Sequence, residues 1–484
     1  MFKFSILACV VCFSVALVSA MAMCAPAWSK EQSITDAANE DVITLEQVLK
    51  RTLKHHPRVS QAMSRVEQSL AQRLIVDSSF DWQLNQSSTA RTSGFYNGWI
   101  IDQSISRILP FANGRVSGGY RLSDGSFPIY EDINRTLSGG EAYLNMRWSL
   151  LQNRDVDDNR VALENAELSI NIAQHQQELV INALLLEAAN HFLRWKLIRE
   201  RRDIIQRLVD LAQARNRAIE QKVAGGELAR ITLTEFEVTM LSRQADLLEM
   251  NQALEQASIG LAMFYRDDNG MPMEFGQTQA ASLHMSESLK RLPSQSDILS
   301  SLSMHPELIA LENEILQTKN VIRLSRNQLM PTLDLKVDFA NDIGAGAQSL
   351  EGFESYVGLD FSLPIGQREA KGKIQSNEAK LDELNMKRQE MLDVFTIEIK
   401  QALAALNNLM KLRDLRDKQA QVALRLMQEE KARFDAGDSD LFLLNSRETD
   451  FSIAQLAAVD AQISLLQQHI SILASAAMLD EAVL

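Results

Sequence analysis

Glycine and proline are missing from two long stretches of the sequence. Neither residue occurs between Glu141 and Ala224, nor between Lys373 and Ala436. Helix interiors exclude both residues, because glycine costs backbone entropy and proline lacks the amide proton, so each stretch can form a helix of about 70 residues, roughly 105 Å long. The mean helix of globular proteins has about three turns. The sequence therefore predicts two helices much longer than a compact domain holds.

Cysteine is equally scarce, and its three residues are confined to the first 24 positions, at Cys9, Cys12 and Cys24. Residues 1–27 have a basic start, an apolar run and an A-x-A motif at Ala25–Ala27, which is typical of a secretory signal peptide cleaved before Trp28 or Met23. A retained membrane anchor is the less favoured alternative. Met23 occupies the place where lipid attachment to Cys24 needs a small residue, so we do not expect lipidation. A mature chain cut at Ala27 has no thiol, disulfide or cysteine metal site.

The sequence also lacks an excess of basic residues and any further long apolar run. The net charge of −14 argues against nucleic acid as a partner, because nucleic-acid binders need basic patches. No later segment has 18 consecutive apolar residues, so no transmembrane helix is expected. The histidines show no metal-binding pair on one helix face, and no P-loop is present. We therefore expect no enzyme, no catalytic or metal site and no cofactor. An exported chain of this kind is either soluble in the periplasm or inserted as a β-barrel.

The sequence that is present looks duplicated. His56–Pro57 aligns with His305–Pro306 at an offset of 249 residues, and Tyr143–Leu150 aligns with Tyr356–Leu363 at an offset of 213. The glycines that end the two long stretches align at an offset of 211 residues, which places Glu237 opposite Glu448. A period this long is too large for a solenoid and indicates a two-fold repeat of one large unit. The falling offset predicts a longer loop between the strands of the first repeat.

Each predicted long helix follows segments in which apolar and polar residues alternate, namely Arg115–Leu122, Tyr143–Leu150, Leu333–Phe339 and Val357–Leu363. Alternation gives a strand one dry and one wet face. It fits an outer-membrane barrel and an ordinary antiparallel sheet on a core equally well. Four strands per protomer cannot close a barrel, and an open sheet cannot sit in lipid. Three copies would supply twelve strands, so barrel insertion predicts a homotrimer in outer-membrane lipid.

The predicted helices also carry seven-residue apolar spacing. Two rows step alternately by three and four residues: Leu392, Phe395, Ile399, Ala402, Leu406 and Leu409, and Leu456, Val459, Ile463, Leu466, Ile470 and Leu473. Such rows supercoil helices against their neighbours. Further apolar positions flank the first row at Val394, Ile397, Leu412 and Leu415. A helix with apolar residues on two flanks can pack on both sides, as the staves of a coiled-coil α-barrel must.

The expected organisation is mainly α with β. We assign residues 1–27 to the signal peptide, 28–79 to an N-terminal segment with the first helix, 80–150 to the strands and loop of the first repeat, 151–265 to its long helical hairpin, 266–295 to a connection outside the tube (an equatorial belt), 296–330 to the first helix of the second repeat, 331–366 to its strands, 367–475 to its hairpin and 476–484 to the tail.

These segments together resemble the TolC-like outer-membrane efflux protein family over essentially the whole mature chain. The matching pieces are Thr44–Leu49 with His56–Pro57, Arg326–Pro331, Phe361–Gly366, Ala432–Gly437 and Arg447–Glu448. Gly119–Tyr130 and Leu261–Asp268 resemble one branch of that family. The resemblance implies a trimer whose twelve-stranded outer-membrane barrel continues into a helical tube across the periplasm. Such a channel-tunnel is the exit duct of a tripartite efflux or type I secretion system and docks an inner-membrane pump through a periplasmic adaptor.

The resemblance also suggests where the functional residues lie. Gly225, Gly226 and Gly437 end the long glycine-free stretches, and in the family such turns meet the adaptor at the periplasmic mouth. Gly226 and Gly437 would supply positive φ; simple helix ends without a partner are the alternative. The candidates for a pore constriction that selects cations are Asp438, Asp440, Asn445 and Glu448. Leu443 and Asn445 stand near positions where family members often carry carboxylates, and Asp438 or Asp440 can equally cap a helix.

Two other readings stay open from the residues alone. A soluble periplasmic coiled-coil scaffold explains the helices but not the alternating segments at corresponding positions. An open porin is disfavoured, because porins lack helices of this length. The sequence names neither the cargo nor the class of pump.

Overall fold

The computed structural model describes residues 42–110, 113–128, 134–273, 280–282 and 294–480. The chain divides into residues 1–42 and 43–484, and the second unit is the one described below. The predicted signal peptide and most of the predicted connection between the halves lie outside the described residues. In chain order the elements are β1 (Val42–Thr44), α2 (Leu45–His55), α3 (Pro57–Asp77), η1 (Ser78–Phe80), β2 (Gln83–Arg91), β3 (Gly98–Leu109), β4 (Gly114–Gly125), β5 (Glu141–Ser149), α4 (Asp158–Ala224), α5 (Arg230–Ala262), β6 (Ala280–Ser282), α7 (Gln295–Ser301), η3 (Leu302–Met304), α8 (Pro306–Asn327), β7 (Thr332–Asp342), η4 (Gln348–Leu350), β8 (Phe353–Ser362), α9 (Arg368–Asp435) and α10 (Leu441–Ser475).

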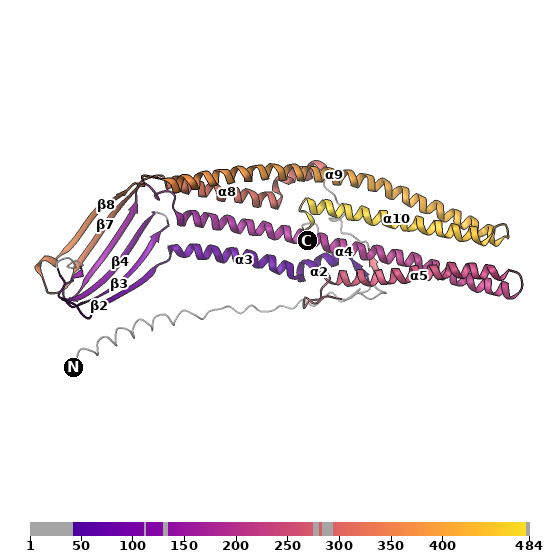
Figure 1. Cartoon of the computed structure of the whole chain (residues 1–484), viewed down its shortest axis with the longest axis horizontal. Helices are drawn as coiled ribbons and strands as arrows, with labels where there is room; N and C mark the ends of the chain where they lie inside the picture. The colour runs from indigo at the N-terminus through magenta and orange to yellow at the C-terminus, as the bar shows by residue number, and fades with distance from the viewer. Residues whose placement is uncertain (1–41, 111–112, 129–133, 274–279, 283–293, 481–484) are drawn as a thin grey trace, which may run out of the picture. The chain divides into compact units, whose positions relative to one another are not determined.

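The two long helices form where glycine and proline are missing. α4 has 67 residues and α9 has 68, close to the predicted 70, and each turns back into a shorter helix, α5 or α10. Within residues 43–484 the larger sheet lies at one end of the helices and the two turns lie at the other (Figure 1). None of the described helices is long and apolar enough to cross a membrane.

Both His–Pro pairs begin a helix. His56 is the N-cap of α3 and His305 is the N-cap of α8, with proline in the first turn of each helix. The Nδ1 atom of His56 accepts a hydrogen bond from the Arg58 amide at 3.2 Å, and that of His305 accepts one from the Glu307 amide at 3.3 Å. Proline suits this position because its missing amide proton would have no helical partner. Both His–Pro pairs therefore mark a helix boundary.

The larger sheet contains six strands, not the four that the sequence predicts. All neighbours are antiparallel, in the order β2-β3-β4-β5-β7-β8. The two strands that the sequence analysis did not predict, β2 and β3, precede the predicted strand at Arg115–Leu122. β2 escapes detection because Gln86 and Ser88 stand where alternation requires apolar residues, and Gln103 and Arg107 do the same in β3. The twelve-strand count for three copies is wrong for this sheet.

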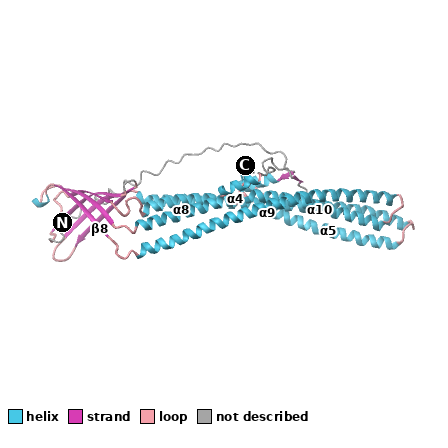
Figure 2. Cartoon of the chain, turned by 90° about the horizontal axis from the view of Figure 1, so that it is seen from above, coloured by secondary structure: helices cyan, strands magenta, loops and turns pink. Residues whose placement is uncertain are grey.

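The sheet has one apolar and one polar face. In the pairing of β5 with β7, Trp148 lies opposite Leu335 on the apolar face, while Arg147 lies opposite Lys336 on the polar face. Figure 2 shows the strands running obliquely to the helices. The predicted alternation in these strands is confirmed.

The helices pack around α4. It contacts α3 and α8 toward the sheet and α5 and α10 toward the turns, and α9 packs on α8 and α10. The main core gathers the fully buried Leu184, Leu185, Phe192 and Trp195 of α4 with residues of α2, α5 and α10. The predicted row in α10 contributes to this core, and Ile399 of the α9 row is buried in a second cluster. The flanking residues Val394, Ile397, Leu412 and Leu415 are 41–64% exposed, so one side of α9 remains uncovered within the chain.

Candidate docking tip

The turn between α4 and α5 is closed by glycine. Gly225 continues the helix at φ −76°, and Gly226 then adopts φ +76°. The amide of Glu227 donates to the Lys222 carbonyl at 2.9 Å, and that of Gly226 donates to Val223 at 3.1 Å. This bonding satisfies carbonyls that the end of a helix would otherwise leave unpaired. A Cβ on Gly226 would meet no atom within 4 Å, so only the backbone conformation requires glycine here.

The turn between α9 and α10 repeats this geometry. Gly437 adopts φ +86°, and the amide of Asp438 donates to the Arg433 carbonyl at 2.9 Å. A Cβ on Gly437 would again meet nothing within 4 Å. The structure therefore has the positive φ that the sequence predicts at both glycines. A docking role of Gly225, Gly226 and Gly437 stays a prediction.

The two turns adjoin through an apolar cluster. Ala212, Ile219 and Phe236 of the first hairpin are buried together, and Leu441 at the start of α10 packs against them. Beside the turns, each hairpin exposes one large apolar side chain: Ile231 is 62% exposed and Phe442 is 82% exposed. These two residues are related by the same offset of 211 that relates the glycines. The tip thus has a fixed base and two exposed apolar side chains, which the sequence analysis did not single out.

The four candidate constriction residues have different environments. Asp438 is exposed, and Asp440 caps α10 by accepting a hydrogen bond from the Leu443 amide at 2.7 Å. Asn445 accepts one from Arg215 Nη1 at 2.8 Å. Glu448 is buried, with only 3% of its side chain exposed. This burial argues against a pore-facing Glu448, and a constriction role of Asp438, Asp440 and Asn445 stays a prediction.

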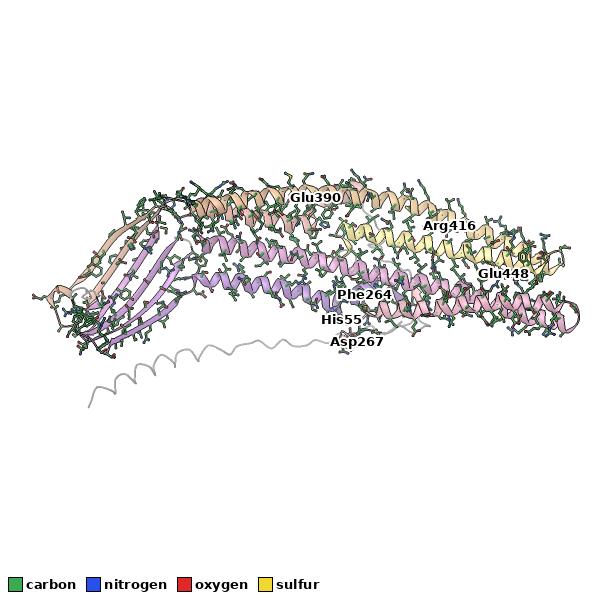
Figure 3. All side chains as sticks on the ribbon, viewed as in Figure 1. His55, Phe264, Asp267, Glu390, Arg416 and Glu448 are labelled. Carbon is green, nitrogen blue, oxygen red and sulfur yellow. The ribbon has the colours of Figure 1, made fainter. Side chains whose placement is uncertain are left out.

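Glu448 is buried because two arginines of the other hairpin surround it. Arg215 of α4 donates from Nη1 to Glu448 Oε2 at 2.9 Å, and Arg243 of α5 lies 3.5 Å from the same oxygen. Burial lowers the pKa of Arg243, an effect that the Glu448 charge opposes. Figure 3 places Glu448 on α10 toward the turn end of the helices. This triad joins the two hairpins and shields the carboxylate that the sequence offered as a pore charge.

The described residues hold no group of three or more His, Cys, Asp or Glu side chains placed to bind a metal ion. The cavities are shallow gaps between helices or strands. One of about 500 Å³ is lined by Arg323 and Arg326 of α8 and by Glu378 of α9, whose charges pair with each other or with α4.

No protein-family model and no curated protein sequence matches this chain. Solved structures do resemble it. The Campylobacter jejuni outer membrane channel CmeC aligns at a TM-score of 0.64 and 16% identity, over 94% of this chain and 91% of that chain. The open state of the Neisseria gonorrhoeae outer membrane channel MtrE gives 0.65 and 15%, over 90% and 89%.

The outer membrane protein VceC of Vibrio cholerae aligns at a TM-score of 0.63 and 15% identity, over 90% of this chain and 96% of that chain. All three alignments span nearly the whole length of both partners. Identities this low speak for the fold, and the fold is the one that the sequence motifs imply. The chain has the fold of TolC-like outer-membrane channels.

Proposed function

We propose that this protein is the protomer of a trimeric exit duct in the outer membrane of a Gram-negative bacterium, with its helices extending into the periplasm. It would work without chemistry of its own, as the final conduit of a tripartite efflux or type I secretion system. An inner-membrane pump would supply the energy, and a periplasmic adaptor would connect the two. The class of cargo is left open.

The observation that carries this proposal is that the larger sheet and the helices, together called the wall, have an unpaired edge on each side. The sheet ends at β2 on one side and at β8 on the other. Among the helices, α3 and α5 pack mainly on α4 on the β2 side, and α9 lies beyond α8 and α10 on the β8 side. The same two edges therefore run through both parts of the wall. Copies placed edge to edge would repeat one head-to-tail contact, which closes into a ring when the rotation allows.

Exposed apolar residues line both edges. On the α3 and α5 side these include Leu74 and Leu248, each 72% exposed. On the α9 side they include Met386 at 70% and Leu415 at 64%. Extended apolar surfaces of this kind mark contacts with a partner. The number three comes from the TolC-like resemblance, because the six-stranded sheet no longer requires it. An origin of the two halves by duplication is part of the same proposal.

Adaptor docking is assigned to the turns around Gly226 and Gly437. Their support is the exposed pair Ile231 and Phe442, carried at corresponding places on two hairpins that the Glu448 triad fixes together. Large apolar side chains in such positions serve as anchors in protein interfaces. Replacing both with Ser should abolish cross-linking to the adaptor while leaving the protein in the membrane.

Fractionation and light scattering test the proposal directly. The protein should sediment with outer membranes, and the detergent-solubilised form should have three times the mass of the mature chain. Recovery from the soluble periplasmic fraction as a monomer would favour the coiled-coil scaffold and reject the duct. Deletion of the gene should also reduce export by the pump and adaptor that the duct serves.

A further inference from the structure

The sheet contains a hairpin that the second half of the chain lacks. β3 and β4 stand between β2 and β5, whereas β7 pairs directly with β8. We propose that this hairpin is part of the barrel wall and that β8 of each copy pairs with β2 of the next copy. With the trimer proposed above, on which this inference rests, the outer-membrane barrel then has eighteen strands.

The hairpin is integrated into the wall on both faces. On the polar face the ring of Tyr143 lies over Gly119, where a side chain would collide with it. Its hydroxyl reaches past β4 to donate to Asp102 Oδ1 on β3 at 2.6 Å. On the apolar face the ring of Trp148 likewise lies over Gly114. These contacts tie β3, β4 and β5 together across three strands, so the hairpin does not fold aside as a separate loop.

The edges of the sheet fit a second copy of the chain. Every residue of the two edge strands, β2 and β8, is exposed. The residues of the inner strand β7 are mostly half-buried. β8 presents Val357 at 74% exposure and Phe361 at 65%, without the proline or apolar-face charge that usually protects an edge. β2 and β8 have 9 and 10 residues and run in opposite directions in the sheet. β8 and the β2 of a neighbour can therefore continue the antiparallel order.

The widths of the two parts of the wall also agree. Six strands about 4.8 Å apart and tilted by about 40° occupy about 38 Å of a perimeter. The four helices that continue the wall, α3, α4, α8 and α9, occupy about 32–40 Å at the usual spacing of 8–10 Å. Four strands would occupy only about 25 Å. With six strands the barrel and the helical tube therefore have similar perimeters.

Cysteine cross-linking tests this arrangement in the full chain. The native cysteines all precede residue 25, and Cys24→Ser removes the one that a cut before Met23 would retain, so the introduced pair supplies the thiols of the mature chain. A cysteine at Gln86 of β2 is combined in turn with one at each apolar-face position of β8, at Phe353, Ser355, Val357, Leu359 or Phe361. Oxidation should produce a ladder of two and three linked copies for one register. A pair of Gln86 with Tyr356, which lies on the polar face, should not link.

A second pair reports on the hairpin itself. Gln86 and Ala142 lie at the same level of the sheet but are separated by β3 and β4, about 14 Å apart, which is too far for a disulfide. Cysteines at these positions should not link in the full chain. They should link within one copy when residues 98–125 are deleted, because β2 then neighbours β5.

Each outcome has a defined meaning. Linkage of the Gln86 and Ala142 positions in the full chain, in a particle with the mass of a trimer, would overturn the eighteen-stranded barrel and leave the proposed function intact. Absence of links between β2 and β8 of different copies in such a trimer would overturn it as well. A monomeric mass by light scattering would reject the proposed function together with the barrel.

Discussion

The two halves of the chain build helices of nearly equal length but different numbers of strands. α5 and α10 have 33 and 35 residues, and α4 and α9 differ by one residue. Yet the first half gives four strands to the larger sheet, and the second half gives only two. A hairpin adds two strands, so it leaves the direction of the strand that enters the long helix unchanged. In this fold, strand number and helix length are therefore independent.

Aligned residues near the turns also differ between the halves. Asp440 caps α10, whereas Ala229 occupies the corresponding place before α5 and makes no side-chain cap. Glu448 is buried against two arginines, but its counterpart Glu237 is exposed. The two turns have the same backbone conformation, whereas the buried carboxylate that joins the hairpins is supplied by α10 and has no buried counterpart at Glu237. The difference can be tested position by position.

The largest effect is expected from removing the buried carboxylate. Glu448→Ala leaves Arg215 and Arg243 without their counter-charge, which should cost about 3–5 kcal/mol of local stability. Hydrogen exchange of the α10 amides near the turn should accelerate accordingly. The matched variant Glu237→Ala should change the same exchange rates by less than about 0.5 kcal/mol. Equal effects at both positions would contradict the structural role of the triad.

Valine at either left-handed glycine tests whether the turns are equivalent. Gly437→Val and Gly226→Val should each strain the reversal by about 1–2 kcal/mol, because a Cβ disfavours this region of φ even in open space. We expect Gly437→Val to abolish adaptor cross-linking while membrane insertion is kept. Gly225→Ala, at ordinary helical φ, serves as the control and should retain cross-linking. Unaltered docking in both valine variants would remove the turns from the interface.

The paired histidine caps predict a dependence on pH. Burial lowers the pKa of His56, helped by Arg266 and Arg58, and burial lowers that of His305. Each ring must be neutral to accept its hydrogen bond, so the folded state binds the proton less readily than the unfolded chain. The contribution is full above the ordinary value of 6.5 and is lost as pH falls through the lowered pKa values.

Replacing both caps with asparagine should remove this dependence. The double variant His56→Asn with His305→Asn keeps a side-chain acceptor that does not titrate. Between pH 7 and 5, the free energy of unfolding of the double variant should therefore fall less than that of the wild type. The expected difference is about 1 kcal/mol for each cap. His175→Gln, inside α4, controls for the loss of a histidine away from the caps. An identical acid response in the double variant would exclude the caps as its source.

The smallest effect concerns the unequal caps of the return helices. Asp440→Ala should destabilise the start of α10 by about 1 kcal/mol, and Ala229→Asp should stabilise the start of α5 by a similar amount.

Bilayer recordings separate the capping role of Asp440 from a role as a charge at the pore mouth. Asp438→Asn with Asp440→Asn should weaken a preference for K⁺ over Cl⁻ if these carboxylates line the pore. Unchanged selectivity would restrict Asp440 to its role as a cap.

Local features were predictable from the sequence, and distant pairings were not. The long helices, the His–Pro starts and the left-handed glycines follow from residue types whose preferences act within one turn. β2 was missed because polar residues stand on both of its faces. Arg215 lies 233 residues before Glu448, and no periodic pattern marks such a pair. Only packing brings these residues together, so the sequence suggested an exposed charge where the fold makes a buried contact.

The exposed β8 edge also bears on how the protein matures. In the proposed duct, a copy that has crossed the inner membrane but has not met its neighbours would present an unpaired apolar strand to every other chain around it. Such a species is prone to aggregate, and its encounter with partners slows as the chain becomes more dilute. Correct maturation should therefore depend on periplasmic chaperones that cover this strand, and overproduction without them should yield aggregates rather than additional channels.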